Sequence, residues 1–291
     1  MNSLWARVIR KIDRDYNLHV FSDKMYVSAL FFLAFNRNLN LLEPTTFNEK
    51  LQWLKLNDRN PRYIQMVDKY EVKKYIAQII GEEYIIPTLG IWEKFDDINF
   101  ECLPNQFVLK CTHDSGGLVI CRDKKTFDRN SAKKIIEKSL KRNFYFWGRE
   151  WPYKEVKPRI IAEKYMEDDS GELKDYKIHN FNNGKKIILV CKDRFSTRGM
   201  TEDFFDESWN HLDIARPGHK NSKNVILKPK NLEKMLCFSE KLAHDIPFLR
   251  VDFYEVGGKV FFGELTFYPS SGFISFEPSS VDQKWGEYID L

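Results

Sequence analysis

Two glycine-containing turns constrain the fold of this 291-residue chain more than any other feature of its sequence. They are Asn183-Gly184 and Gly257-Gly258, dipeptides that readily adopt the positive φ angles of tight hairpin turns. Segments rich in strand-forming residues flank both turns, at 175–182, 185–194, 248–256 and 259–267. The sequence therefore predicts two antiparallel hairpins in its C-terminal half.

Apolar residues recur at spacings of three and four in the first hundred residues, which predicts a mostly helical N-terminal region. Thr46 and Glu49 have the spacing of a capping box, so we expect a helix to begin there. Further helices are predicted over 66–80, 130–139 and 231–244, with Gly81 ending the first and Asn130 and Asn231 capping the others. Short strands are expected at 85–87 and 107–110. The predicted fold class is α+β with antiparallel sheets, with a boundary near residue 104.

The charge balance excludes one class of partner. Lys and Arg outnumber Asp and Glu by only 46 to 42, a net charge of +4, so no extended positive field is available to hold nucleic acid. Five cysteines without CxxC spacing favour free, buried thiols over disulfides or zinc.

The N-terminal segment indicates where the protein resides. It lacks the residue order of a signal peptide, and the apolar stretch 25–35 is too short to span a bilayer. We therefore expect a cytoplasmic protein with no transmembrane segment. The basic, aromatic start, with Trp5, Arg7, Arg10 and Lys11, is compatible with a solvated amphipathic helix or with contact to a membrane surface.

Lys110 and the following Ser115-Gly116-Gly117 form the first candidate site, between two apolar runs. A Ser-Gly-Gly turn leaves backbone N–H groups able to face an anion, and Lys110 adds a positive charge. This arrangement is typical of a phosphate-binding loop, although the GK[ST] of a Walker loop is missing. The alternative is a purely structural hairpin tip.

The second candidate site is the hairpin around Asn183-Gly184, preceded by an apolar strand that ends at residues 163–166. A two-residue turn sets Lys177 opposite Val190 and Asp175 opposite Lys192. One face of the hairpin would then carry Asp175, Lys177, His179, Lys192 and Arg194. The alternative is a solvated sheet face without a ligand.

The third candidate site is the hairpin around Gly257-Gly258. If the loop counts three residues, or if a bulge restores the same parity, Asp252 lies opposite Glu264 and Arg250 opposite Thr266. The apolar residues of these strands then fill the other face. Two carboxylates on such apolar strands need a cation, and Mg²⁺ accepts one or two carboxylates plus substrate phosphates. The alternative is an ion pair of Arg250 with Asp252 or Glu264.

These motifs, in this order, resemble those of the ATP-grasp superfamily. Their amino-acid sequences resemble those of its TupA-like branch, which is linked to teichuronopeptide and related surface polysaccharides. The resemblance rests on FVLKCTHDSGG, RIIAEKYMEDDSGELKDYK and RVDFYEV with FFGELTFYPSSGF, and it covers residues 40 to 291. It implies an ATP-grasp-like α+β fold, in which two antiparallel lobes enclose a nucleotide after a helical N-terminal region. The implied domains are residues 1–104, a small nucleotide-binding lobe at 105–166, and a larger lobe with the metal and substrate site at 167–291.

The resemblance also implies roles for individual residues. ATP would contact Lys110, Ser115, Gly116, Gly117, Glu163, Lys164, Tyr165, Met166, Asp175, Lys177 and Lys192. Mg²⁺ would be bound by Asp252, Glu264 and Thr266, although Thr266 stands where many ATP-grasp ligases carry Asn. The substrate would contact Arg194, Arg250, Ser270 and Ser271, and Arg250, Lys110 and Lys177 would serve catalysis. Ser270 and Ser271 follow the proposed metal site directly, but a plain turn that ends the strand is the alternative.

The activity implied is that of a carboxylate–amine ligase, which forms an amide through an acyl phosphate at the expense of ATP. The expected substrates are a uronic acid of a saccharide and a small amine, with possible peripheral contact to a polysaccharide assembly machinery. The alternatives are a sugar kinase or glycosyltransferase of polysaccharide synthesis, and a non-catalytic scaffold. No nucleophile elbow is present, so a hydrolase is not expected.

Overall fold

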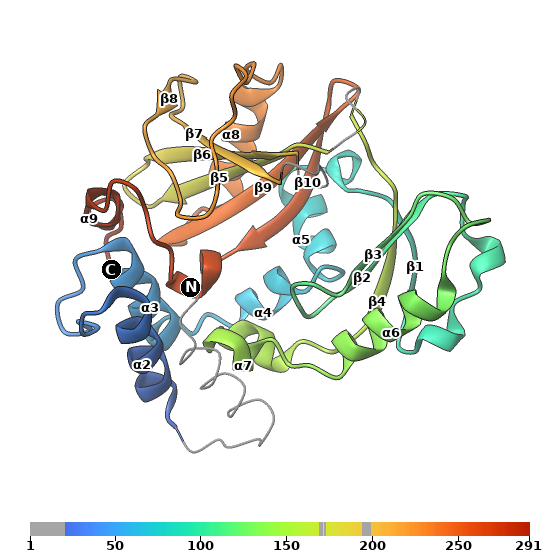
Figure 1. Ribbon diagram of the computed structural model, residues 1–291, viewed down its shortest axis with the longest axis horizontal. Coiled ribbons are helices and arrows are strands. Elements are labelled where there is room, and N and C mark those ends of the chain that lie inside the picture. The colour runs from blue at the N-terminus through green and yellow to red at the C-terminus, as the bar shows by residue number, and fades with distance from the viewer. Residues whose placement is uncertain (1–20, 169–170, 172, 194–198) are drawn as a thin grey trace. The chain divides into compact units, whose positions relative to one another are not determined.

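The computed structural model describes residues 21–168, 171, 173–193 and 199–291 (Figure 1). The basic N-terminal segment and Arg194 therefore lie outside the described residues. The chain divides into two compact units. The six-stranded unit comprises the described residues up to Arg59, Phe146–Glu150, and the described part of Asp168–Leu291. The four-stranded unit comprises Asn60–Tyr145 and Trp151–Glu167, so residues 60–104 of the predicted N-terminal region fold together with 105–145.

The four-stranded unit is built on an antiparallel sheet with the strand order β1-β4-β2-β3. Its strands are β1 (Thr88–Trp92), β2 (Phe107–Cys111), β3 (Leu118–Cys121) and β4 (Ile160–Lys164). Its helices are α4 (Arg62–Val67), α5 (Val72–Ile79) and α6 (Arg129–Leu140), with 3₁₀ turns η1 (Glu82–Tyr84), η2 (Phe95–Asp97), η3 (Phe100–Cys102) and η4 (Trp151–Glu155). Helix α6 packs on β2 and β3 over a core that includes Phe100, Phe107 and Ile136 (Figure 1). Burial of these aromatic and aliphatic side chains stabilises the unit.

The six-stranded unit contains a second antiparallel sheet, with the strand order β10-β9-β5-β6-β7-β8. Its strands are β5 (Asp175–Phe181), β6 (Lys186–Lys192), β7 (Thr201–Phe205), β8 (His211–Leu212), β9 (Phe248–Val256) and β10 (Lys259–Thr266). Helix α8 (Leu232–Leu242) packs against β5 and β9 (Figure 1). The other face of the sheet is not covered by α8, and it carries polar side chains and the helices α3 (Phe47–Asn57) and α9 (Ser280–Gly286).

The remaining helices of this unit are α2 (Asp23–Phe35), α3 (Phe47–Asn57) and α9 (Ser280–Gly286), with the 3₁₀ turn η5 (Pro269–Gly272). The short helix α7 (Tyr145–Gly148) also belongs to this unit, except for its first residue. Phe47 of α3 contacts Phe248 of β9 and Trp285 of α9, with ring centroids 5.0 and 5.3 Å apart. These aromatic contacts join the two helices to one end of the sheet.

Thr46 and Glu49 form the capping box that the sequence predicts. The Thr46 hydroxyl accepts from the N–H of Glu49 at 3.3 Å, and the Glu49 carboxylate accepts from the N–H of Thr46 at 3.1 Å. Arg37 reinforces this start, because its guanidinium donates to the Glu49 carboxylate and to the Thr46 hydroxyl. Helix α8 begins after Asn231 as expected.

Two helix predictions are corrected. The helix expected over 66–80 is split into α4 and α5, because the Asp68 carboxylate accepts from the N–H groups of Tyr70 and Glu71 at 2.8 and 3.2 Å and so forms a turn. Asn130 lies inside α6, and Asp128 caps this helix by accepting from the N–H of Ser131 at 3.0 Å.

Two further expectations concern cysteine and the membrane. All five cysteines are free, but Cys102 and Cys237 are exposed, contrary to the expectation of buried thiols. Within the described residues, no helix is both long and apolar enough to cross a membrane.

Candidate active site

One face of the six-stranded sheet, which we call the charged face, carries most of the candidate residues of this unit. Strand pairing aligns Lys177, Asp252 and Glu264 across β5, β9 and β10, and it aligns Arg250 with Thr266 in the next row. The intervening residues of β9 and β10 are the buried Leu249, Val251, Phe253 and Leu265. Because side chains alternate along a strand, the apolar set faces α8 and the charged set faces the opposite side.

The pairing of Asp252 with Glu264 and of Arg250 with Thr266 is confirmed. The loop, however, has two residues rather than three, since Val256 pairs directly with Lys259. A bulge at Gly263 compensates for the shorter loop, so that Asp252 and Glu264 still lie opposite each other, as predicted for a hairpin with a bulge. A Cβ on Gly263 would lie 3.0 Å from the carbonyl oxygen of Asp252, so glycine fits this close approach of the two strands.

The charged face is held together by ion pairs. The Arg250 guanidinium donates from Nε and Nη2 to the two oxygens of Asp252 at 2.7 and 2.8 Å, and from Nη2 to Glu264 at 2.8 Å. The Lys177 ammonium donates to Asp252 and lies 3.3 Å from Asp175. Burial alone would raise the pKa of Asp252, but Arg250 and Lys177 outweigh it, so this pKa is well below its usual range.

The register of the β5–β6 hairpin differs from the prediction by one residue. Its turn uses three residues, 182–184, because Phe181 donates to the carbonyl of Lys185. Lys177 therefore pairs with Leu189, and Asp175 pairs with Cys191. Consequently Lys192 points to the other side of the sheet and does not belong to the charged face.

His179 shares the charged face, as predicted, and is buried beside Arg250. Its Nδ1 lies 3.1 Å from the carbonyl oxygen of Ile187. Burial, with a smaller effect of Arg250, lowers the pKa of His179 to about 3. The imidazole is therefore neutral near pH 7 and cannot supply a positive charge to a phosphate.

In the four-stranded unit, Glu163 binds two lysines. The Lys110 ammonium lies 2.6 Å from one carboxylate oxygen of Glu163, and the Lys73 ammonium lies 2.6 Å from the other. Burial would raise the pKa of Glu163, but the two lysines lower it, so the carboxylate stays ionised. The structure thus brings Lys110 and Glu163 together and adds Lys73, which also donates to the carbonyl of Ile86 at 2.8 Å.

The predicted phosphate loop is held at both of its ends. Asp114 accepts from the N–H of Gly117 at 3.3 Å and from the Ser139 hydroxyl, and Cys111 donates to the carbonyl of Gly117 at 2.8 Å. Gly117 is needed for packing, because a Cβ there would lie 2.2 Å from the Ser139 hydroxyl oxygen. Ser115 and Gly116 are exposed and therefore accessible to a ligand.

The residues predicted to recognise adenine follow the strand β4. Lys164 ends this strand, and its N–H donates to the carbonyl of Pro87 at 3.0 Å. Tyr165 and Met166 come next and are half-buried. The Arg122 guanidinium lies 5.8 Å from the centre of the Tyr165 ring. This segment therefore places a half-buried aromatic side chain close to a cation.

Ser270 and Ser271 lie in η5, a segment we call the serine turn (Pro269–Gly272). Both have left-handed backbone angles, with φ values of 49° and 56°. The Ser271 hydroxyl donates to Glu150, and Arg216 donates to the Ser270 hydroxyl at 3.3 Å. Arg216 also lies 3.4 Å from Glu202 of β7, which pairs with Cys191 on the charged face.

Lys73, Glu150 and Arg216 were not among the predicted site residues. Glu150 is buried, and burial raises its pKa, with Lys55 as the first counteracting charge. A lysine, a glutamate or an arginine at the edge of a loop or helix carries no sequence pattern that distinguishes it from a solvated residue. The contacts that identify these three residues are all with distant parts of the chain.

Asp252 and Glu264 fit a magnesium ion. Within the described residues, no group of three or more His, Cys, Asp or Glu side chains could hold a metal alone. Mg²⁺, however, binds through one or two carboxylates and takes its other ligands from phosphates and water. Asp252 and Glu264 lie opposite each other, and the Glu264 side chain is 45% exposed, so it can reach a ligand. Thr266 is the next oxygen donor along β10.

Comparison with known proteins identifies a family for this chain. The profile of the family described as TupA-like ATPgrasp matches residues 49–290, most of the chain. No curated protein matches the sequence.

Several solved structures resemble the chain at low sequence identity. D-alanine–D-alanine ligase from Bacillus anthracis, complexed with ATP, has 17% identity and a TM-score of 0.42, over 70% of this chain and 55% of that chain. D-Alanine-D-alanine ligase from Helicobacter pylori has 15% identity and a TM-score of 0.42, over 84% and 69%. The RimK domain ATP-grasp protein from Sphaerobacter thermophilus has 9% identity and a TM-score of 0.42, over 80% and 70%. The chain thus spans only about half the length of the first of these structures.

Proposed function

The chain belongs to the TupA-like ATPgrasp family, and from this premise we propose that it is an ATP-dependent carboxylate–amine ligase. The α+β fold with two antiparallel sheets is that of the ATP-grasp superfamily. The observation that carries the proposal is the charged face, where Arg250, Asp252 and Glu264 lie in register on adjacent strands. A site with two carboxylates and a guanidinium is better suited to the transfer of a phosphoryl group than to the transfer of protons.

The residues of the two units have different roles in this proposal. Lys110, with Lys73 beside it, would balance the charge of the ATP phosphates, and the exposed Ser115 and Gly116 would cover them. The main chain of Tyr165 and Met166 would contact adenine. The assignments to Lys110, Lys73, Tyr165 and Met166 are supported by the ion pairs of the two lysines with Glu163 and by the place of Tyr165 and Met166 directly after the strand β4.

On the charged face, Asp252 and Glu264 would hold Mg²⁺. When bound, this ion neutralises phosphate charge during the transfer. Arg250, released in part from Glu264, would orient the carboxylate substrate and balance the charge that develops on it. Lys177 is fixed by Asp252 and Asp175 and would contact the phosphate that is transferred. An oxygen of the carboxylate substrate would attack the γ-phosphorus of ATP, so that an acyl phosphate forms and ADP leaves. An amine would then attack the acyl carbon, so that an amide forms while phosphate leaves and the amine loses a proton.

We propose a uronic acid as the carboxylate and an amino acid or small amino alcohol as the amine. This choice is supported only by the resemblance of the motifs to the branch linked to surface polysaccharides. The site for the acceptor would include Ser270, Ser271 and Arg216. Arg216 connects this group to the charged face, because it contacts both Ser270 and Glu202. Arg216 adds a second guanidinium for an anionic acceptor.

The test is turnover of ATP with a panel of uronic acids and amines, with the product identified by its mass. ADP release that depends on both substrates, together with an amide product, is the expected result. A phosphosugar product, or consumption of a nucleotide-sugar, would replace the ligase with a kinase or a glycosyltransferase. In parallel, MgADP should raise the melting temperature of the protein, and an unchanged melting temperature with every nucleotide would exclude ATP binding.

A further inference from the structure

Helix α3 carries a stripe of polar side chains that are completely buried. They are Asn48, Gln52 and Lys55, each with 0% exposure. Their spacing places them on one face of the helix. Polar groups, and charges above all, are costly to bury unless hydrogen bonds compensate them, so such a stripe needs a specific partner.

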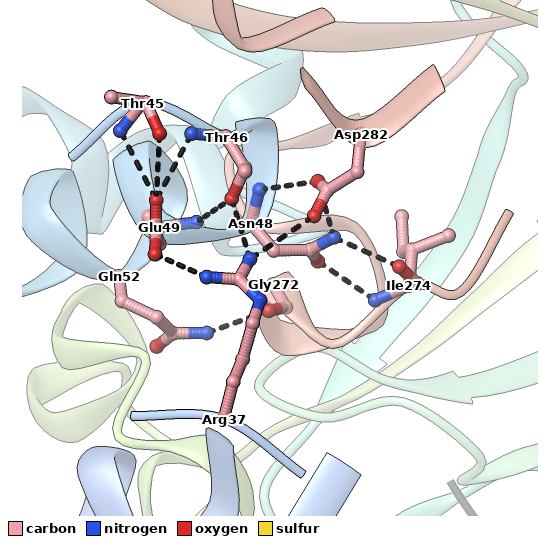
Figure 2. A network of polar contacts seen from close by, with 9 residues as sticks. All are labelled: Arg37, Thr45, Thr46, Asn48, Glu49, Gln52, Gly272, Ile274 and Asp282. Atoms are coloured by element: carbon pink, nitrogen blue, oxygen red, sulfur yellow. Dashed lines mark hydrogen bonds and ion pairs between the residues drawn. The ribbon is translucent and has the colours of Figure 1, made fainter. Parts of the chain in front are cut away.

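The partner of the stripe is the serine turn and the residues that follow it. The Gln52 amide donates to the carbonyls of Ser271 and Gly272 at 3.0 and 2.7 Å. The Asn48 amide donates to the carbonyl of Ile274 at 2.8 Å, and its oxygen accepts from the N–H of Ile274 at 2.8 Å. Figure 2 shows the Gln52 amide directed to Gly272 and the Asn48 amide directed to Ile274.

Lys55 completes the contact. Its ammonium donates to the carbonyl of Ser271 at 2.7 Å, to the carbonyl of Gly148 at 2.8 Å and to the side-chain oxygen of Gln52 at 2.8 Å. Glu150 contacts the same serine from its other end, because it accepts from the Ser271 hydroxyl. Ser271 is thus held at its carbonyl by Lys55 and at its side chain by Glu150.

This contact explains an unfavourable backbone. Left-handed angles at a residue other than glycine are uncommon, and they persist only where the surroundings enforce them. Ser270 and Ser271 adopt them in succession. The stripe enforces the conformation by binding the carbonyl groups of the turn. The chain at Gly148 can lie close to the serine turn because glycine has no side chain; a Cβ there would lie 2.4 Å from the Ser271 hydroxyl oxygen.

We propose that Lys55 and Gln52 are positioning residues of the acceptor site, which hold the serine turn in the conformation that presents Ser270 to the carboxylate substrate. The proposal rests on the ligase function proposed above. Ser270 is the exposed member of the turn, and it is joined through Arg216 to Glu202 on the charged face. Helix α3 therefore belongs to the substrate side of the enzyme, and ATP binding does not depend on these two residues.

The experiment compares two lysines of the same helix. Lys50, like Lys55, donates to a main-chain carbonyl, but its partner is Ile289, at 2.6 Å, outside the serine turn. Lys55→Met should raise the KM for the carboxylate or lower kcat by about 10- to 100-fold, because small displacements of a positioning group have effects of this size. The KM for ATP should stay within about twofold of the wild-type value. Lys50→Met should leave all three constants unchanged.

A second variant covers the case in which Lys55→Met does not fold. Gln52→Met keeps the buried ammonium and removes only the amide, and it should produce the same selective loss on the carboxylate side. The positioning role is refuted, while the ligase function stands, if the folded variants have the same kinetic constants as Lys50→Met. It is also refuted if they raise the KM for ATP and the KM for the carboxylate equally. If the wild-type protein binds MgADP but forms no amide with any substrate pair, the ligase function fails and the positioning role with it.

Discussion

Asp252 and Glu264 lie opposite each other on adjacent strands, but their surroundings differ. Asp252 is 1% exposed and binds both Arg250 and Lys177, whereas the Glu264 side chain is 45% exposed and binds Arg250. Loss of the charge of a buried carboxylate between two cations is costly, because it leaves buried charge uncompensated, whereas a half-exposed carboxylate contributes little to stability. The two carboxylates therefore differ in structural importance.

Replacement of each carboxylate by its amide should separate these contributions. Glu264→Gln should abolish turnover and lower the free energy of unfolding by less than about 1 kcal/mol, because it removes one half-exposed ion pair. Asp252→Asn should abolish turnover and also lower that free energy by about 3–5 kcal/mol, since two buried cations lose the carboxylate that they share. Urea denaturation and ADP release measure both quantities, and equal losses of stability would contradict the assignment.

His179 should make the protein sensitive to mild acid. Its pKa is about 3 in the folded state and 6.5 in an ordinary environment, so below pH 6.5 the unfolded chain takes up a proton that the folded chain excludes. The contribution of His179 to stability is complete above pH 6.5 and is lost as the pH falls toward 3.

Unfolding by urea at several pH values checks this expectation. Between pH 6.5 and 4, the free energy of unfolding should depend less on pH in His179→Gln than in the wild type. His244→Gln, at a histidine whose side chain is 78% exposed, is the control for the substitution itself. Identical slopes in all three proteins would show that His179 takes up its proton equally in both states.

At the residue scale, the sequence predicted the group of Arg250, Asp252, Glu264 and Thr266, because charged and apolar residues alternate there with the period of a strand. It could not predict the role of Lys55. The carbonyl that Lys55 binds lies 216 residues away along the chain, and no local pattern encodes such a contact.

At the scale of the hairpin β9–β10, the bulge decides whether the site exists. Gly263→Ala should lower both turnover and stability, because a Cβ would lie 3.0 Å from the carbonyl oxygen of Asp252 and 3.1 Å from the Tyr254 ring. Overpacking of this kind costs about 1–3 kcal/mol. The control is Gly258→Asn at the tip of the same hairpin, where a Cβ meets nothing within 4 Å and where Asn tolerates the positive φ. Equal effects of both variants on turnover would show that the bulge is not needed.

Element predictions succeeded where the signal was local and failed where it was not. The capping box of α3 involves residues within one helical turn, so the sequence revealed it. The split between α4 and α5 depends on Asp68, which also pairs with Arg159 at 2.7 Å, 91 residues further along the chain. The register of β5 and β6 depends on whether a turn containing Asn-Gly uses two or three residues, and both forms accept this dipeptide.

At the scale of the whole molecule, the four-stranded unit should fold alone. A fragment of residues 60–167 contains all four strands of its sheet together with α4, α5 and α6, so it should unfold cooperatively when followed by circular dichroism. A fragment of residues 168–291 lacks α3, whose Phe47 packs on Phe248 and Trp285, and should not unfold cooperatively. Non-cooperative unfolding of the first fragment would show that it depends on the rest of the chain.

The α+β class and the order of the motifs were predictable from the sequence, because strands, helices and turns each have a local signature. The division into units was not. The six-stranded unit is assembled from segments separated by residues 60–145 and 151–167, and composition does not change at these junctions. Only the contacts between distant segments reveal which of them fold together.

The contact between Phe47 and Trp285 sets an order of events while the ribosome makes the protein. The four-stranded unit is fully synthesised once residue 167 has been added, but the six-stranded unit must wait for α9. At about 5–20 residues per second, Phe47 waits roughly 10 to 50 s for its partner. During this interval Phe47 lacks the ring of Trp285 that covers it in the folded protein.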